Sequence, residues 1–458
     1  MSDLLRSEKP GSGSKNGPDQ SDDRKMPSIG YFLNFHRVER GEAGRSGFRP
    51  HKYLEVVWRR QDPIVSPILA LWLLVPAAIA LAFARGDLHT WVFGLSYIAM
   101  LPCASTLGLT GQELARKVPR VAGVLIETFL GSIVETILFI VLIAKHDESG
   151  GSLITVVQAA ILGSILANML LCLGFCLFIG GVSHQHQTFH DLIGGTSSDV
   201  LLVAGFALLL PGTYFSALYS SAISPESDLT LVELRAHSLS ISRGTSIILL
   251  VSFFVYLYHN VSTHATLFDK ILSEEEERMP ENGENDPEGK RPRLTFSECC
   301  FTLLIALGCV SILAYILVRE IHPIVHSTAV TEQFMGLILV PLVEKLAEHV
   351  TAVDRMVKNQ ANMAIFLCVG PSIQTMLFNT SLVVIIGWGL GKPMDLNFEV
   401  FMLVSMVLAI VVVVHFLADA HSSYLKGWFL IIVYCIIALA AWYYPGVTIN
   451  SPRNQQEN

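Results

Sequence analysis

Residues 336–353, GLILVPLVEKLAEHVTAV, read as a membrane-spanning helix, yet they hold four ionisable side chains within six positions. These are Glu344, Lys345, Glu348 and His349. A charged side chain at a helix centre costs roughly 2.5–3.5 kcal/mol on insertion scales if it faces lipid. We therefore expect this cluster to face the protein interior and to mark a functional site.

The rest of the chain has the composition of a membrane protein. Of its 458 residues, 52% are hydrophobic and only 15% are charged. The apolar residues collect in runs of about 20, the length that crosses roughly 30 Å of hydrocarbon. Eleven such runs lie near residues 64–84, 91–111, 122–144, 153–180, 199–221, 243–259, 299–319, 331–353, 361–389, 398–418 and 427–446. The pattern predicts an all-α polytopic membrane protein with about eleven transmembrane helices.

Several other classes of function find no support. The chain has no nucleotide-binding loop, catalytic triad, haem motif or redox motif, so we predict neither enzymatic activity nor a cofactor. Its net charge of −8 does not favour a nucleic-acid partner. The eight cysteines lie in or beside apolar runs, which favours small apolar packing over a disulfide framework or a zinc site. Homo-oligomerisation stays open.

Basic residues predict the orientation, because cytosolic loops of membrane proteins are enriched in lysine and arginine. They gather in the segments before the first run, after the second and between the sixth and seventh, which places the N-terminus in the cytosol. The loop 181–195, GVSHQHQTFHDLIGG, should also be cytosolic but has no lysine or arginine. Its His184, His186 and His190 are either part of a solvated polar loop or a sensor of pH or metal.

Polar segments divide the chain into two membrane halves. We predict a disordered cytosolic tail (1–60), a first half (61–259), an acidic cytosolic linker (260–298), a second half (299–446) and a short C-terminal tail (447–458). Each half has a helix with acidic residues at mid-span, followed by one rich in small and polar residues. A leading helix plus two five-helix repeats puts the repeats in opposite orientations, as in secondary transporters with a midplane site.

The acidic residues inside the runs indicate what that site binds. Away from the run ends there are four carboxylates, Glu127, Glu135, Glu344 and Glu348, and one cation, Lys345. At 100° per residue, the charged residues of 344–349 lie within an arc of roughly 140°. A structural ion pair with Lys345 is one interpretation, but it leaves the first two acids unexplained. Paired acids in matching helices favour a cation site.

The chemistry of buried carboxyl groups then suggests antiport. A carboxyl group withdrawn from water favours its protonated form, whereas a hard cation prefers ionised oxygen ligands. Cations and protons therefore compete for the same group. Ser132 lies in a run with two of the acids, and Ser164 and Gln374 lie in the runs that follow the two acidic ones. All three offer further oxygens, although hydrogen bonding between helices is an equal alternative for amides such as Gln374.

Several motifs resemble the cation/proton exchanger family, in particular the fungal vacuolar calcium/proton exchangers. They are GSIVE (131–135), where the family has Gly-Asn-x-x-Glu, and LAEHVTAV (346–353), where it has Gly-Asn-Ala-Ala-Glu-His. Supporting stretches are VQAAILGSILANMLLCLG, LSISRGTSIILLV, GPSIQTMLF and PMDLNFEVF. The resemblance implies Glu135 and Glu348 as the acids that bind the metal cation and protons, with His349 beside them. It also implies a vacuolar membrane.

The same motifs depart from the family at the expected site. Ser132 stands in place of Asn, Glu344 and Lys345 replace the Gly-Asn pair, Glu127 replaces Asn and Pro371 replaces Ser. The main prediction is a secondary active antiporter of calcium, or another small cation, and protons. The alternative is a non-transporting or selectivity-altered homologue, with Lys345 in the cation site and a regulatory role.

Overall fold

A computed structural model describes residues 68, 70–84, 88–115, 117–118, 120–146, 153–184, 187–224, 229–260, 294–328, 330–419 and 421–444. Within these residues the fold is helical, apart from one pair of two-residue strands. The tail 1–60, most of the linker 260–298, the C-terminal tail and His186 lie outside the described residues.

The helices of the first half coincide with the six apolar runs predicted there. After the short 3₁₀ helix η2 (Leu71–Leu73) come α3 (Leu74–Ala84), α4 (His89–Ala115), α5 (Arg120–Gly131), α6 (Ile133–Ala144), α7 (Leu153–Leu166), η3 (Ala167–Cys172), α8 (Leu173–Ser183), α9 (Asp191–Ala222) and α10 (Leu231–Tyr258). The segments α7, η3 and α8 form one continuous helix over 153–183.

The second half repeats this use of interrupted helices. It contains α12 (Phe296–Ser327), α13 (Glu332–Phe334), η6 (Met335–Leu339), α14 (Val340–Val357), α15 (Ala361–Gln374), η7 (Thr375–Asn379), α16 (Thr380–Gly389), α17 (Val400–Ala418) and α18 (Tyr424–Tyr443). Here α15, η7 and α16 form one helix over 361–389.

The helices are those of a polytopic membrane protein. Eight helices in the described residues are long and apolar enough to cross a membrane, and Leu71–Ala84 and Ile133–Ala144 are shorter apolar helices. The run 122–144 is divided between α5 and α6 at Ser132, and the run 331–353 carries the charged cluster. Eleven crossings therefore stay a prediction, although each predicted run coincides with helical structure.

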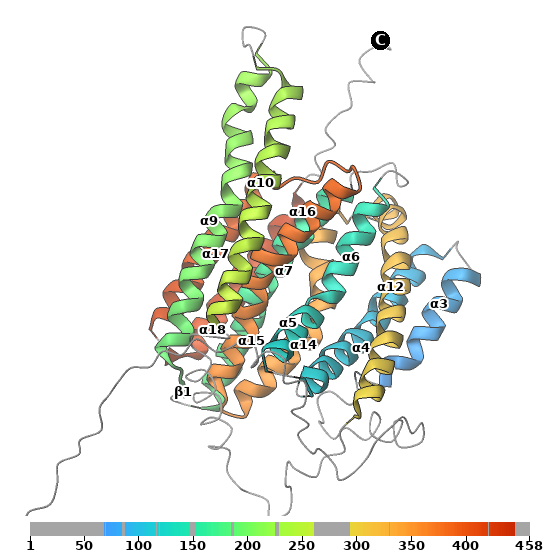
Figure 1. Cartoon of the computed structure of the whole chain (residues 1–458), viewed down its shortest axis with the longest axis vertical. Helices are drawn as coiled ribbons and strands as arrows, with labels where there is room; N and C mark the ends of the chain where they lie inside the picture. Colours follow the sequence, from blue (N-terminus) through green and yellow to red (C-terminus); the bar gives the residue numbers. More distant parts are fainter. Residues whose placement is uncertain are drawn as a thin grey trace, which may run out of the picture.

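The strands β1 (Gln187–Thr188) and β2 (His421–Ser422) join two distant loops. They pair antiparallel, with Gln187 opposite Ser422 and Thr188 opposite His421. Both loops must therefore lie on the same side of the membrane, and the number of crossings between them must be even. Figure 1 shows β1 at one end of the helical bundle, opposite the end beyond which α9 and α10 project.

Three π-helical segments interrupt the central helices. They are η3, η6 and η7, and such segments are frequent at functional sites. A Cβ added to Gly163 of α7 would lie 2.1 Å from the backbone oxygen of Leu337 in η6, and one added to Gly336 would lie 2.6 Å from that of Val156. Only glycine, which has no Cβ, lets the two backbones come this close. The two glycines therefore allow α7 of the first half to pack directly against η6 of the second.

Pro341 follows η6 and stands in the first turn of α14. The sequence leaves open whether this proline kinks the helix or frees carbonyl groups for an ion. One carbonyl beside it, that of Leu339, accepts a 2.6 Å hydrogen bond from the Tyr97 hydroxyl. This carbonyl is therefore satisfied by another part of the protein, as a membrane interior requires.

Candidate cation-binding site

A cavity of about 410 Å³ lies between the two halves. Its wall is built by α4, α5, α6 and α10 of the first half and by α14 and α15 of the second. The lining begins at Glu135, just after the break between α5 and α6, and at Pro371 within α15, and it reaches Gln112, Asn260 and Met363 near helix ends. Those ends adjoin loops that are predicted to be cytosolic, so the cavity leads from the bundle centre toward that side.

Lys345 forms salt bridges with both predicted acids, Glu135 and Glu348. The Lys345 Nζ lies 3.1 Å from Glu135 Oε2 and 3.5 Å from Glu348 Oε2. The Lys345 and Glu135 side chains are buried, whereas the Glu348 side chain is 33% exposed and lines the cavity. Acids from different halves thus share one ammonium group at the cavity wall.

The position of Glu135 follows from the break between α5 and α6. Ser132 leaves helical geometry (φ −101°, ψ 4°), and Glu135 therefore falls in the first turn of α6. Carboxylates are favoured in a first turn, where unpaired backbone N–H groups carry positive partial charge. The break thus gives a buried acid a favourable electrostatic environment at mid-bundle.

Donors from η7 hold the Glu135 carboxylate from the opposite half. Asn379 Nδ2 donates to Glu135 Oε2 over 2.9 Å, and Thr375 Oγ1 lies 3.2–3.3 Å from both carboxylate oxygens. Sequence reasoning missed Thr375, and for Asn379 it left two roles open, a neutral carbonyl for the ion and a hydrogen bond between helices; the structure shows the hydrogen bond. The four-residue spacing of these two polar residues was the available signal, since it places both on one helix face.

Ser132 and Gln374, two of the candidate site residues, are hydrogen-bonded to each other. Gln374 Nε2 donates to Ser132 Oγ and to the Thr128 carbonyl, each over 2.6 Å. Both side chains line the cavity beside Glu135. The Gln374 amide nitrogen therefore joins the two halves.

Glu344 is a buried acid on the same cavity. Its residue is only 3% exposed, and neither carboxylate oxygen has a hydrogen-bond partner among the described residues. A buried polar group without a partner costs roughly 1–3 kcal/mol, and more when it is charged. An ion, a proton or water in the cavity would remove that cost.

His349 has a structural contact on the far side of α14. Its Nε2 lies 3.1 Å from Asn168 Oδ1 in η3 of the first half. His349 is buried and is not among the residues that line the cavity. Its contact therefore joins α14 to η3 and does not bring the imidazole ring to the cavity.

The remaining predicted residues are placed differently. Pro371 lines the cavity within α15. Ser164 is fully buried in α7, its hydroxyl has no partner among the described residues, and it does not line the cavity. Glu127 belongs to α5, but its side chain lies outside the described set.

The charge of the cluster is suited to a cation. With all groups ionised, Glu135, Glu344 and Glu348 contribute three negative charges and Lys345 one positive charge, which leaves −2. A divalent cation or two protons would neutralise that charge. Carboxylate, hydroxyl and amide oxygens are also the ligands that hard cations prefer.

Comparisons with known proteins agree with this architecture. The family described as sodium/calcium exchanger protein matches residues 88–262 and 300–443. A Ca²⁺/H⁺ antiporter of Synechocystis is 31% identical over 383 residues, covering 82% of this chain and 97% of the relative. A vacuolar calcium ion transporter of Cryptococcus neoformans is 29% identical over 427 residues, covering 78% of this chain and 70% of the relative.

A solved structure shows the same fold. The structure of native YfkE superposes with a TM-score of 0.64 at 23% identity, covering 82% of this chain and all of that one. The family match spans both membrane halves and begins at residue 88, after the predicted N-terminal tail and α3. The chain therefore belongs to the sodium/calcium exchanger protein family, in its group of cation/proton exchangers.

Proposed function

We propose that the protein is a secondary active antiporter that exchanges Ca²⁺, or another small cation, for protons across the vacuolar membrane. The observation that carries this proposal is the pairing of Glu135 and Glu348, from opposite halves, at one cavity. The names of the Synechocystis and Cryptococcus relatives support the exchange reaction, and the latter name supports the vacuole.

The proposed cycle depends on competition at the same oxygens. Protons arriving from the acidic lumen neutralise Glu135 and Glu348, and a cation from the cytosol replaces them. The cluster's charge of −2 allows one divalent cation to exchange with two protons without leaving net charge in the membrane interior, where it would be costly. Rocking of the two inverted repeats would then expose the cluster to each side in turn.

The hydrogen bonds that Glu135 accepts from the opposite half should depend on whether a proton or a metal cation is bound to it. Asn379 and Thr375 of η7 donate to the ionised form of Glu135 in α6. Protonation removes an acceptor position from that carboxyl group and weakens the contact between halves. We infer that this contact couples occupancy to the relative position of the repeats.

The salt bridges of Lys345 favour one competing function. A permanently seated ammonium would fill the cation position and leave a non-transporting membrane protein with a regulatory role. Against it stands Glu344, whose unpartnered carboxyl group offsets the ammonium charge and leaves the cluster negative. The relatives, which are named as transporters, also favour exchange.

Proton efflux from acid-loaded proteoliposomes tests the proposal. The purified protein is challenged in turn with calcium, manganese, sodium and potassium, and lumenal pH is followed with a dye. We expect alkalinisation with calcium or another of these cations, and its loss in Glu135→Gln and Glu348→Gln. If no cation changes the lumenal pH while a reconstituted relative is active in the same assay, the non-transporting function is favoured.

A further inference from the structure

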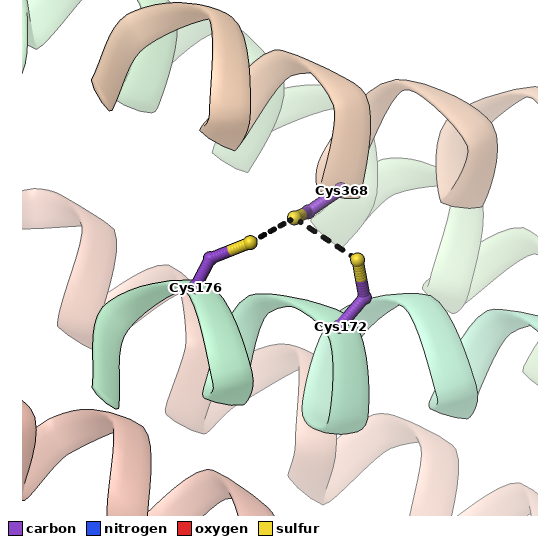
Figure 2. Close-up of side chains that lie close together, drawn as sticks. All are labelled: Cys172, Cys176 and Cys368. Carbon is purple, nitrogen blue, oxygen red and sulfur yellow. Dashed lines mark hydrogen bonds between the residues drawn. The ribbon is translucent and has the colours of Figure 1, made fainter. Parts of the chain in front are cut away.

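Three cysteines from both halves of the protein converge at one point. Cys172, at the end of η3, and Cys176 of α8 lie four residues apart on one helix, and Cys368 of α15 faces them (Figure 2). The Cys368 Sγ is 3.3 Å from that of Cys172 and 3.6 Å from that of Cys176. All three sulfur atoms lie within 4.8 Å of one another.

The cluster is buried and lies directly behind the cation site. The three cysteines are 0–1% exposed. Asn168, the partner of His349, lies one turn before Cys172, and Leu367, the neighbour of Cys368, lines the cavity. A single buried cysteine is ordinary small apolar packing. Three thiols whose sulfur atoms all point at one another need a further explanation.

We propose that Cys172, Cys176 and Cys368 form a binding site for one soft, low-coordinate cation of the Cu(I) class. Sulfur ligands select soft cations such as Cu(I), whereas Ca²⁺ and Mg²⁺ require oxygen. Structural zinc sites take four ligands, and the described residues supply three ligand atoms here. A disulfide would join two of the sulfur atoms and leave the third without a role.

The architecture gives this site two features of a built metal centre. A ligand pair at positions i and i+4 places two sulfur atoms on one helix face, and the third comes from the facing helix. The π-helical segment η3 ends at Cys172, so the helix is irregular where its first ligand stands. Binding would displace a proton from each thiol that becomes a thiolate, and no change of redox state is needed when the ion is supplied as Cu(I).

A bound ion would also tie the halves together, because helix 153–183 supplies two ligands and helix 361–389 the third. This consequence rests on the proposed function. If exchange requires the repeats to move, Cu(I) should inhibit it in the wild type and not in Cys368→Ser.

The test measures metal binding directly, so it does not depend on transport. The purified full-length protein in detergent is titrated anaerobically with Cu(I) held by a coloured competing chelator, and bound copper is also quantified after desalting. We expect about one equivalent of Cu(I) per chain, no retained Ca²⁺ at the cluster, and a spectrum with sulfur neighbours in X-ray absorption. Cys172→Ser, Cys176→Ser and Cys368→Ser should each weaken binding by more than the roughly tenfold loss typical of an outer-shell change.

Two matched variants guard against misfolding and against other thiols. Cys103→Ser removes a thiol that is just as buried but lies in α4, and it should leave binding unchanged. A second variant keeps only the three cluster cysteines, with serine at positions 103, 299, 300, 309 and 435, and should still bind about one equivalent. A monodisperse preparation of that variant without bound copper would overturn the proposal. Unchanged binding in Cys368→Ser would overturn it as well.

Discussion

Replacing Lys345 by Asn tests the electrostatics of the cation site most directly. A calcium ion lies about 2.4 Å from a ligating carboxylate oxygen. The Lys345 Nζ lies 3.1 Å from Glu135 Oε2, so an ion bound to that oxygen is at most about 5.5 Å from the ammonium group. At an effective dielectric near 20, the repulsion between them is about 6 kcal/mol.

The gain in Ca²⁺ affinity caused by Lys345→Asn will be smaller than this repulsion energy. Removing the ammonium group leaves Glu135 and its neighbouring acids with no internal counter-charge, so protons compete more strongly for them. We therefore expect Lys345→Asn to lower the half-saturating Ca²⁺ concentration by at least about tenfold, or about 1.4 kcal/mol, at alkaline pH. The gain should shrink as the external pH falls.

The assay is uptake of radioactive calcium into proteoliposomes with an imposed pH gradient, at several calcium concentrations and two external pH values. Lys345→Arg keeps the charge and should show no gain. Lys358→Asn removes an exposed lysine at the end of the same helix, where it pairs with Asp354 over 2.6 Å, and should behave as the wild type. An unchanged or raised half-saturating concentration in well-folded Lys345→Asn would refute the reasoning, since the ammonium would then not lie near the bound ion.

Three further predictions concern the acid beside the lysine, the contact between halves and a loop. Glu344→Gln reduces the charge of the cluster from −2 to −1, and the half-saturating Ca²⁺ concentration should rise at least about tenfold in the same uptake assay. Gly163→Ala would place its Cβ 2.1 Å from the Leu337 backbone oxygen and should cost about 1–3 kcal/mol, seen as a lower Tm, whereas Gly308→Ala has open space and should not. Burial raises the pKa of Asp395, in the loop before α17, so the charged carboxylate opposes folding above that pKa. Asp395→Asn should therefore raise Tm at pH 8, and the difference from the wild type should disappear as the pH falls.

Much of the fold could be predicted from the length of the apolar runs alone. The length of a membrane crossing is fixed by the bilayer, so each of the eleven predicted runs coincides with helical structure. The irregular segments could not be predicted in this way. The π-helical segments η3, η6 and η7 arise from packing between halves, and the contact of Gly163 with Leu337 joins residues 174 positions apart.

In the site too, some features follow from the local sequence, whereas others depend on which distant helices face one another. Glu135, Lys345 and Glu348 could be predicted as a group because buried charge in a membrane is costly wherever it occurs. Their partners could not, because hydrogen bonds to a carboxylate depend on which helix faces it. Thr375 was missed for this reason, and His349 proved to contact Asn168 instead of lining the cavity.

The pair Glu344 and Lys345 is best understood as one substitution rather than two. Together they add no net charge where the resembling exchangers have Gly-Asn, and both side chains are buried beside Glu135. A lone lysine there would reduce the cluster to a charge of −1 and oppose any divalent ion. With Glu344 present, the cluster keeps the −2 that a divalent cation or two protons can neutralise, while the ammonium group holds the carboxylates together when neither is bound. We therefore propose that the pair alters how tightly a cation is held without removing the charge that makes exchange with protons favourable.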